Sequence, residues 1–598
     1  MRDRGFATAV AGGIAASLAV TATYWPALGN GFVWDDWVPL VDSPVFREPA
    51  RWREALLTPP LQDPVGVRPL AMLSFMLQLW AGHREPAPFH LANIGIHALN
   101  VLLLVLLVWR VLSEGASRQW VRAVAAASSG LLYGLHPALT EPVAWISCRY
   151  DLLMTFFLLL GLLLDRMLPA GGWPRACLVG AAFFAAMLSK ETAVGFLPAL
   201  PLVHLALVRR ESAALGRAFL VQALAAHGRV YAALFAAFAL YLAGRFALYG
   251  PALGLERMIA QFGDVGAPGE RMLAFVASYS RHVHDALWPF QRIVPSRSLQ
   301  LPISVTEVAP TIAAAAGATT LILLAARAGD CGRRLMLLFM AFLAAIAPVS
   351  NLLPLPGRPG ELWVASRYLT FPLVFVCLAA PFAFRLAESL LARHVSRPRA
   401  LLAALAAAWL AASFASVRVT VPLWRDDGTL NEWAIASGAA SDWRYSNLGE
   451  YYFKTRALDK AREAFLNAVR LRGTEGYHWY HLGIAEAALG NSEQARRAFR
   501  QALELNRDII RARIDLAKLE LAAGDPQAAA KVLQEGVERL PYSDDPGEEG
   551  TLRYLLGRAY GALGRSEQAA AQLRAALRLA QNPADRRAAE EALRALAP

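Results

Sequence analysis

Residues 6–37, FATAVAGGIAASLAVTATYWPALGNGFVWDDW, place an apolar segment, 6–26, just before two adjacent carboxylates, Asp35 and Asp36. An apolar segment of this length can cross roughly 30 Å of hydrocarbon as a helix. It has no convincing signal-peptide cleavage site, so we expect it to remain as the first membrane span. Ionisable groups at a membrane edge are costly to keep there and are commonly functional. The stretch therefore predicts a membrane anchor followed by an acid pair with a chemical task.

Apolar runs of similar length recur up to about residue 421, and the polar loops between most of them are short. Arginines gather in alternate loops, as the positive-inside rule expects for the cytoplasmic side of a membrane protein. This pattern accounts for most of the formal net charge of +12, and no nucleic-acid-binding signature accompanies it, so we expect no nucleic-acid partner. With the N-terminus in the cytoplasm, the sequence predicts eleven crossings, near 6–26, 90–112, 120–138, 152–168, 175–190, 192–208, 230–250, 305–327, 335–352, 368–386 and 400–421.

One further segment, 271–288, is too polar for an ordinary span, because it carries Arg271, Arg281, His282, His284 and Asp285. A helix with charged groups at these intervals can lie along the membrane surface or enter the membrane and return. We expect 271–288 to be an amphipathic or re-entrant helix on the outer face.

The sequence becomes repetitive after the last span. Leu448-Gly449, Leu482-Gly483 and Leu516-Ala517 recur at a spacing of 34 residues, and Leu556-Gly557 follows at 40, with the turn-rich stretch 541–547 accommodating the difference. Small residues let two helices approach closely, and large residues fill the space between successive repeats. The register predicts four tetratricopeptide repeats. It also places small residues at Ala461, Ala495, Ala529 and Ala569, and large ones at Phe465, Phe499, Leu533 and Leu573.

These patterns predict an all-α fold in two parts. Residues 1–421 would form a polytopic helical bundle in the membrane, with outer loops at 27–89 and 136–151. Residues 422–598 would form an α-solenoid of about four repeats. The parity of the predicted crossings puts the repeats on the same side of the membrane as the acid pair.

The second outer loop contains ionisable residues that could meet the acid pair of the first loop. Glu141 would orient the acid pair or an acceptor, or would belong to a solvated charge cluster at a helix end. Sequence alone leaves both readings open. Other polar residues of the two loops are Arg68, His136, Arg149 and Asp151.

Lys190 is the only lysine before Lys454, although the membrane part contains many arginines. A compact ammonium suits a point contact to a phosphate. The alternative is a lysine that reaches the membrane edge beside its own counter-ion, Glu191. Arg245 and Arg367 lie at span ends and fit either a phosphate contact or interfacial anchoring.

No Gly-rich phosphate loop and no His/Cys ligand cluster is evident in the sequence, and the four cysteines are scattered. A nucleotide-sugar enzyme of the soluble type is therefore disfavoured, and no metal site is predicted. The remaining possibility is an enzyme whose substrate is delivered within the membrane.

A set of motifs in the membrane part resembles a known family, the transmembrane and tetratricopeptide-repeat-containing glycosyltransferases. These are relatives of the protein O-mannosyltransferases in the GT-C superfamily. The motifs cover nearly the whole membrane part in order, and the repeats cover the rest. They are Gly31-Phe32-Val33-Trp34-Asp35-Asp36, Arg68-Pro69-Leu70, Phe89-His90-Leu91-Ala92-Asn93 with His97-Ala98-Leu99-Asn100, His136-Pro137 with Thr140-Glu141-Pro142-Val143, Arg149 with Asp151, Ser189-Lys190-Glu191, and Ala347-Pro348-Val349-Ser350-Asn351 with Arg367-Tyr368.

The resemblance implies transfer of a mannose-like hexose from a polyprenyl-phosphate carrier, with inversion, on the non-cytoplasmic face. Asp35 or Asp36, ahead of Glu141, would take the acceptor hydroxyl proton. The donor phosphate would be held by cations, and because a phosphate is a good leaving group a metal is not obligatory. The resemblance assigns the phosphate to Lys190, Arg245 and Arg367, with supporting roles for Arg68, His136, Arg149, Asp151 and Glu191. One departure is Ser366, where the family commonly has an acidic residue before the Arg-Tyr pair.

The preference for Arg over Lys indicates a bacterial inner-membrane protein with a periplasmic site and an undecaprenyl-type carrier. A eukaryotic relative would use a dolichyl-type carrier in the endoplasmic reticulum lumen. The acceptor would be a protein Ser/Thr hydroxyl or a glycan, held by the repeats. The alternatives are an O-antigen ligase or oligosaccharyl-transfer enzyme, and a non-enzymatic membrane-anchored scaffold whose repeats recruit partners.

Overall fold

A computed structural model of the chain describes two compact units, Met1–Asp426 and Asp427–Pro598, where the sequence analysis placed the boundary after residue 421. The arginine- and alanine-rich repeats fall in the second unit. Part of the first outer loop and most of the stretch 541–547 lie outside the described residues. The structure describes residues 2–596 apart from 38–39, 42, 44, 58–67, 114–117, 170, 209–220, 222–224, 251–267, 291–296, 301–302, 304, 352–360, 540–545 and 581.

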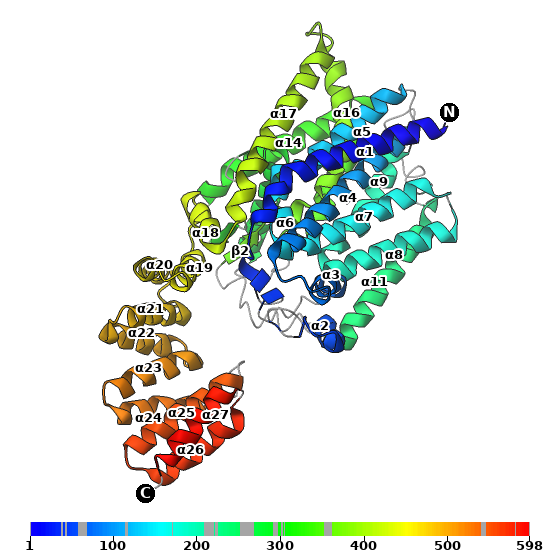
Figure 1. Cartoon of the computed structure of the whole chain (residues 1–598). Helices are drawn as coiled ribbons and strands as arrows, with labels where there is room; N and C mark the ends of the chain where they lie inside the picture. Colours follow the sequence, from blue (N-terminus) through cyan, green and yellow to red (C-terminus); the bar gives the residue numbers. More distant parts are fainter. Residues whose placement is uncertain are drawn as a thin grey trace. The chain divides into compact units, whose positions relative to one another are not determined.

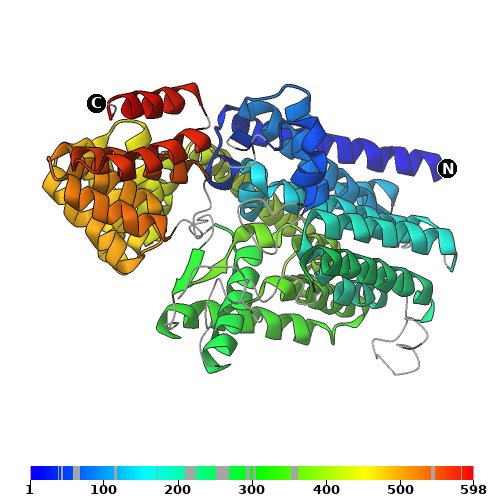
Figure 2. The same ribbon diagram turned by 90° about the horizontal axis from the view of Figure 1, so that it is seen from below.

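The first unit contains a row of helices in which each helix packs against the next (Figures 1 and 2). In order of contact these are α1 (Arg2–Tyr24), α4 (Pro86–Leu112), α7 (Arg149–Met167), α8 (Trp173–Ser189) and α11 (Gly228–Tyr249). A second series of contacts joins α5 (Gln119–Gly134), α16 (Leu373–Leu391), α15 (Gly329–Ile346) and α9 (Phe196–Leu207). The remaining long helices are α13 (Pro268–Leu287), α14 (Val305–Ala325) and α17 (Pro398–Thr420).

Buried polar side chains link helices within the first row and between the two rows. His97 of α4 hydrogen-bonds the Gly134 carbonyl of α5 at 3.0 Å, and Asn100 donates to the Leu152 carbonyl of α7 at 3.1 Å. In lipid such bonds link helices because no water competes for the polar groups. The helix contacts let the short elements of the two predicted outer loops converge at one end of α4 and α7.

Eight helices among the described residues are long and apolar enough to cross a membrane, so the chain is a multi-pass membrane protein. Each of them coincides with one of the eleven predicted crossings. The predicted spans 120–138, 175–190 and 192–208 fall on helices, but α5 has 16 residues, α8 has 17 and α9 has 12. The helix α13, which covers most of the segment 271–288, is not among the eight.

The all-α fold class is confirmed, with one small exception in the described part of the chain. The strands β1 (Arg297–Gln300) and β2 (Glu361–Val364) form an antiparallel pair in which Arg297 is opposite Val364. Short helical elements lie in or near the stretches of sequence that carry the motifs. They are η1 (Trp25–Gly29), η2 (Trp34–Asp36), α2 (Trp52–Leu57), α3 (Pro69–Trp80), η6 (Pro137–Leu139), α6 (Thr140–Ala144), η7 (Ile146–Cys148), η8 (Glu191–Gly195), η10 (Ser366–Leu369) and η11 (Val421–Trp424).

The second unit begins with α18 (Asp427–Ala436) and continues as four helix pairs, as the repeat register predicted. A Cβ atom on Gly449 would lie 2.4 Å from the Phe465 ring, and one on Gly483 would lie 2.5 Å from the Phe499 ring. Only a residue without a side chain allows this approach. The pairs are α19 (Asp442–Lys454) with α20 (Leu458–Leu471), α21 (Gly476–Ala488) with α22 (Ser492–Leu505), α23 (Ile510–Ala522) with α24 (Pro526–Val537), and α25 (Pro546–Ala562) with α26 (Ser566–Leu579), followed by α27 (Pro583–Arg594).

Candidate functional site

The second acid of the pair, Asp36, joins the two predicted outer loops. It is 0% exposed. One carboxylate oxygen accepts hydrogen bonds from the Ser147 amide at 2.8 Å and the Ser147 hydroxyl at 2.5 Å, and the other accepts from the Val33 amide at 3.1 Å. Burial outweighs these hydrogen bonds and raises the pKa of Asp36 to about 7. Asp36 is therefore a buried clamp between η2 and η7.

The first acid, Asp35, has the opposite environment, because its residue is exposed. Trp34, the residue before the acid pair, has an unusual backbone conformation. Its φ of 50° lies in the left-handed region, which bulky residues rarely adopt, and its ring packs edge-on against Trp145 at 5.2 Å and Trp424 at 5.4 Å. Of the two carboxylates, Asp35 is therefore the one at the protein surface and Asp36 the one in the interior.

Glu141, predicted to face the first loop, pairs instead with residues near the start of α16. It is 1% exposed, and its two oxygens accept from Arg367 Nη1 at 2.6 Å and from the Ser366 hydroxyl at 2.7 Å. The guanidinium also lies over the Trp145 ring at 5.3 Å. Ser366, the departure from the family pattern, thus supplies a hydrogen-bond donor to a carboxylate that comes from another part of the chain.

Lys190 pairs with Asp151 in the interior. Its ammonium donates to both oxygens of that carboxylate at 2.7 Å, and the two side chains are 6% and 2% exposed. The reading in which Lys190 uses Glu191 as its counter-ion is wrong, because Glu191 is bound elsewhere. The Lys190 ammonium also lies 5.2 Å from the centroid of the Tyr368 ring. Two helices, α7 and α8, are joined by this ion pair.

Glu191 receives Arg68 in a two-point ion pair. Arg68 Nε and Nη2 donate to the two carboxylate oxygens at 3.1 and 2.8 Å. The planar guanidinium matches a carboxylate in this geometry. Arg68 also lies over the Tyr150 ring at 4.9 Å, and the two ionic side chains remain partly exposed, at 18% and 28%. This pair ties α3 of the first outer loop to the start of η8.

The three ion pairs are neighbours. Cys148 lies within electrostatic range of Arg367, Asp151, Glu141 and Lys190. The Tyr150 side chain, two residues on, is within range of Arg68, Asp35 and Asp36. The structure therefore brings together most of the residues that the sequence nominated, around η7 and the start of α7.

Arg245 reaches this cluster only at its edge. It donates to the hydroxyl of Tyr241 on its own helix at 3.3 Å, and Tyr241 is within electrostatic range of Glu191 and Arg68. Arg245 is 9% exposed. The contact is compatible with a place beside the Arg68 pair and does not bring Arg245 to the acid pair.

Two of the predicted supporting residues are engaged in the scaffold. Arg149 is 1% exposed and donates to Asn93 Oδ1 at 2.8 Å, Gln78 Oε1 at 2.6 Å and the Phe89 carbonyl at 2.9 Å, which joins α3, α4 and α7. The second of these two residues, His136, is also buried.

His136 serves as a local cap. Its Nδ1 accepts from the Ala138 amide at 3.3 Å, so Nε2 carries the proton and donates to the Ala286 carbonyl of α13 at 3.1 Å. Burial lowers the pKa of His136 to about 4, which keeps it neutral. Arg149 and His136 hold the site in shape and do not face a substrate.

Sequence reasoning missed Ser147 and Asn93 as parts of the site. Asn93 donates to the carbonyls of Trp145 and Ile146 at 3.1 and 3.2 Å, and so fixes the loop that holds Ser147. Asn93 ends the motif Phe89-His90-Leu91-Ala92-Asn93, and an amide in an apolar run is a signal of such a bond. Ser147 carries no comparable signal.

Comparison with known proteins relates both parts of the chain to described ones. Residues 479–509 and 551–583 match family models described as tetratricopeptide repeat. The chain is 38% identical over 128 residues to the protein O-mannosyl-transferase Tmtc1 of Drosophila melanogaster. The matched region covers 21% of this chain and 14% of the relative. It is 31% identical over 215 residues to human protein O-mannosyl-transferase TMTC1, covering 32% and 23%.

Solved structures similar to part of the chain include MamA, at 21% identity and a TM-score of 0.24, covering 26% of this chain and 87% of MamA. Another is YrrB, a tetratricopeptide-repeat protein with a peptide-binding site, at 21% identity and a TM-score of 0.24, covering 27% and 80%. The chain spans less than a quarter of the length of the O-mannosyl-transferases described above. Within those matches, its resemblance to the transmembrane and tetratricopeptide-repeat-containing protein O-mannosyl-transferases is confirmed.

Proposed function

We propose that the protein is a membrane glycosyltransferase of the protein O-mannosylation type, which moves a mannose-like hexose from a polyprenyl-phosphate carrier to an acceptor hydroxyl. The observation that carries the proposal is the convergence of an exposed acid, Asp35, with partly exposed cations around η7. A base and a cationic site for a leaving phosphate are the two groups that such a transfer needs. Sequence similarity to named protein O-mannosyl-transferases supports the same chemistry.

Asp35 is the residue that we assign as general base. It would take the proton of the acceptor hydroxyl as that oxygen attacks the anomeric carbon, and the phosphate would leave from the opposite face, so the configuration inverts. Asp36 cannot reach a hydroxyl because it is fully covered and its oxygens already accept three hydrogen bonds. Its role is to hold η2 against η7 so that Asp35 keeps its position.

Arg367 and Arg68 are the cations best placed to meet the donor phosphate. Their side chains are 13% and 18% exposed, whereas that of Lys190 is 6% exposed and is saturated by Asp151. A phosphate that replaces or shares the partner carboxylate would find each guanidinium already oriented by that partner. Lys190 would then not contact the phosphate itself. Its ammonium lies against the Tyr368 ring, which also contacts the Arg367 guanidinium, so Lys190 would act through these neighbours.

The donor would be an undecaprenyl-type or dolichyl-type phosphate sugar on the non-cytoplasmic face. The phosphate leaves as a stabilised anion, so a divalent metal is not required by the chemistry. The repeats of the second unit would bind the acceptor, a protein Ser/Thr hydroxyl or a glycan, since stacked repeats present extended binding surfaces.

The test is transfer of radiolabelled mannose from synthetic polyprenyl-phosphate mannose to periplasmic extract by the purified full chain. Asp35→Asn should lose at least about 100-fold in kcat with little change in donor KM, which is the usual range for a general base. Glu48→Gln removes another exposed carboxylate of the same loop and should keep full activity. Equal activity in Asp35→Asn and Glu48→Gln would remove Asp35 from the mechanism. No transfer by wild type with a panel of lipid-linked donors would favour the scaffold.

A further inference from the structure

A second polar cluster lies at the other end of α7, far from the acid pair. Asp151 and Asp165 are separated by 14 residues of this helix, or about 21 Å at the rise of an α-helix. Asp165 accepts from Arg175 Nε and Nη2 at 3.0 and 2.5 Å through one oxygen, and hydrogen-bonds His204 Nε2 at 3.0 Å through the other. The cluster is independent of the residues assigned to sugar transfer.

The geometry of this cluster disfavours a metal ion, although Asp165, His204 and His227 offer ligand atoms within 4.8 Å of one another. The two imidazole rings are stacked, with centroids 3.5 Å apart and planes 14° from parallel. A histidine binds a metal in the plane of its ring, so two stacked rings cannot converge on one ion without turning. In addition, the Arg175 guanidinium occupies the cation position, because Nη2 donates to His227 Nδ1 at 2.7 Å.

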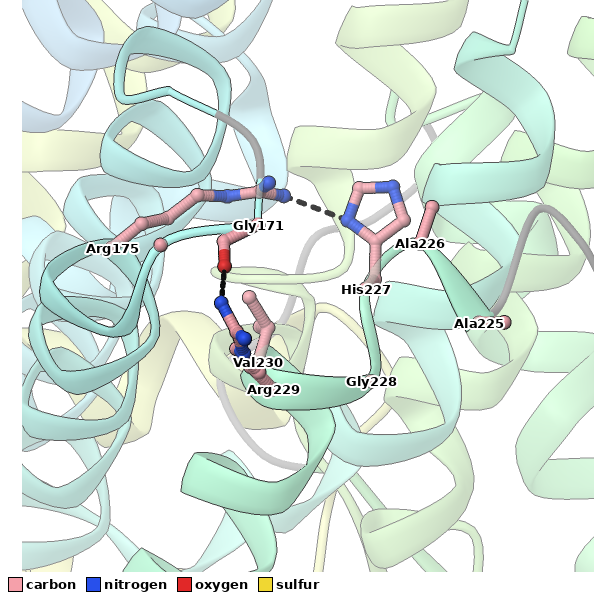
Figure 3. A pocket seen from close by; sticks show the side chains of 9 residues that line it. Gly171, Arg175, Ala225, Ala226, His227, Gly228, Arg229 and Val230 are labelled. Carbon is pink, nitrogen blue, oxygen red and sulfur yellow. Dashed lines mark hydrogen bonds between the residues drawn. The ribbon is translucent and has the colours of Figure 1, made fainter.

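A cavity of about 350 Å³ opens beside this cluster, as Figure 3 shows. This volume is in the range of about 300–1,000 Å³ that is typical of small-ligand sites. The side chains of Arg175 and Arg229 enter it from two helices, and the Arg175 guanidinium points toward the His227 ring (Figure 3). The remaining lining residues are small or apolar, namely Gly171, Gly172, Ala225, Ala226, Gly228 and Val230.

The two guanidinium groups at the cavity have N–H donors that make no hydrogen bond with the described residues. Arg175 Nη1 makes no hydrogen bond with any described residue, although the Arg175 side chain is only 4% exposed. Arg229 uses Nη1 on the Gly171 carbonyl, which leaves Nε and Nη2 without a hydrogen bond to the described chain. Arg166 adds a third positive charge within range of His227, and Asp165 is the carboxylate within the same range among the residues that the structure describes.

Two helix starts reinforce this charge. Both α8, which begins at Trp173, and α11, which begins at Gly228, start at the cavity wall. The N-terminus of a helix carries a partial positive charge and amides that favour anions. The cavity therefore has the chemistry of an anion site, built primarily on the arginines and supported by the helix ends.

The surroundings identify which anion is accessible. Trp173 is 56% exposed next to Arg229, whose guanidinium carbon lies 5.7 Å from the indole ring. Exposed tryptophans of membrane proteins sit at the level of the lipid headgroups. Beyond the cavity, the outer surfaces of the two helices are apolar, with Leu178 and Phe235 exposed. Acyl chains can lie on such a surface while the headgroup enters the cavity.

We propose that this cavity binds a phosphate group, that of an anionic membrane lipid, at the membrane face opposite the acid pair. Arg175 Nη1 and Arg229 hold the phosphate oxygens, and Asp165 with the stacked histidines keeps the Arg175 guanidinium in place. The site is separate from the sugar donor, so it stands whether or not the protein transfers sugar.

The test measures binding to the purified full chain by native mass spectrometry with three probes: phosphatidylglycerol, diacylglycerol, which lacks the phosphate, and inorganic phosphate. Arg229→Gln should weaken phosphatidylglycerol binding about five- to tenfold, as loss of one charge-assisted contact would. Arg118→Gln removes an exposed arginine from the same predicted membrane face, outside the cavity, and should bind phosphatidylglycerol as wild type does.

Gly228→Glu is the second variant. A Cβ at Gly228 meets nothing within 4 Å, and a carboxylate is favourable at a helix start, so the variant should fold, yet its charge repels a phosphate. Thermal unfolding checks that it does. Equal phosphatidylglycerol binding by wild type, Arg229→Gln and Gly228→Glu would overturn the proposal, as would equal binding of diacylglycerol. Inorganic phosphate that binds as tightly as the lipid, with the same loss in both variants, would overturn the lipid as occupant.

Discussion

Replacing Asp36 by Asn should change how the stability of the protein depends on pH. The pKa of Asp36 rises from 3.8 to about 7 in the folded protein, chiefly through burial. The folded chain therefore binds a proton that the unfolded chain releases between about pH 4 and pH 7. This contribution to stability is complete below about pH 4 and is lost as pH rises through 7. Three pKa units correspond to about 4 kcal/mol.

The assay is the free energy of unfolding, measured by SDS titration in mixed micelles between pH 4.5 and 8.5. Other carboxylates are common to wild type and Asp36→Asn, so their effects cancel in the difference. Relative to wild type, the variant should gain about 3 kcal/mol across this range, because about 2.5 pKa units of the shift lie above pH 4.5. Glu48→Gln, which alters an exposed carboxylate of the same loop, should show no comparable trend. A difference between Asp36→Asn and wild type that stays constant with pH would refute the buried, protonated clamp.

Three further outcomes follow from single contacts. Lys190→Met should cost about 3–5 kcal/mol of unfolding free energy, because it leaves Asp151 buried and unpaired. Adding Asp151→Asn to the same chain should recover much of this loss. If the effects of the two substitutions simply added, the two side chains would not form the ion pair. Arg367→Gln should raise donor KM about tenfold in transfer kinetics, and an unchanged KM would remove it from the phosphate site. Gly483→Ala should destabilise the repeats by about 1–3 kcal/mol in thermal unfolding, because its Cβ would lie 2.5 Å from an aromatic ring. Gly550→Ala should be tolerated, because its Cβ would make only ordinary contacts, the nearest with Leu579 at 3.6 Å; equal effects would contradict the packing.

The features that sequence predicts well are periodic. The repeats were placed because Gly449 and Gly483 recur at one spacing with Phe465 and Phe499, and the structure packs each glycine on the ring of its own repeat. The eight candidate spans follow from hydropathy in the same way. Whether short helices such as α5 and α8 cross the membrane is harder to predict from sequence. Length and apolar content are the only criteria, and these helices have 16 and 17 residues.

Pairings between distant side chains could not be read from the chain. Lys190 has a carboxylate next to it in sequence, yet it binds Asp151, 39 residues away, while Arg68 crosses 123 residues to reach Glu191. These choices depend on how α3, α7 and η8 meet, which no local pattern encodes. The same holds for Asp165 and His204, whose cluster has no motif in the sequence.

The anomeric configuration of the transferred sugar tests the central claim most directly. A polyprenyl-phosphate mannose of one defined anomeric configuration is incubated with the full chain and acceptor extract, and linkage-specific mannosidases then digest the labelled product. One displacement assisted by Asp35 predicts label in the opposite configuration, and no label with Asp35→Asn. Product with retained configuration, or the same yield from Asp35→Asn as from wild type, would contradict a carboxylate-assisted transfer at this site.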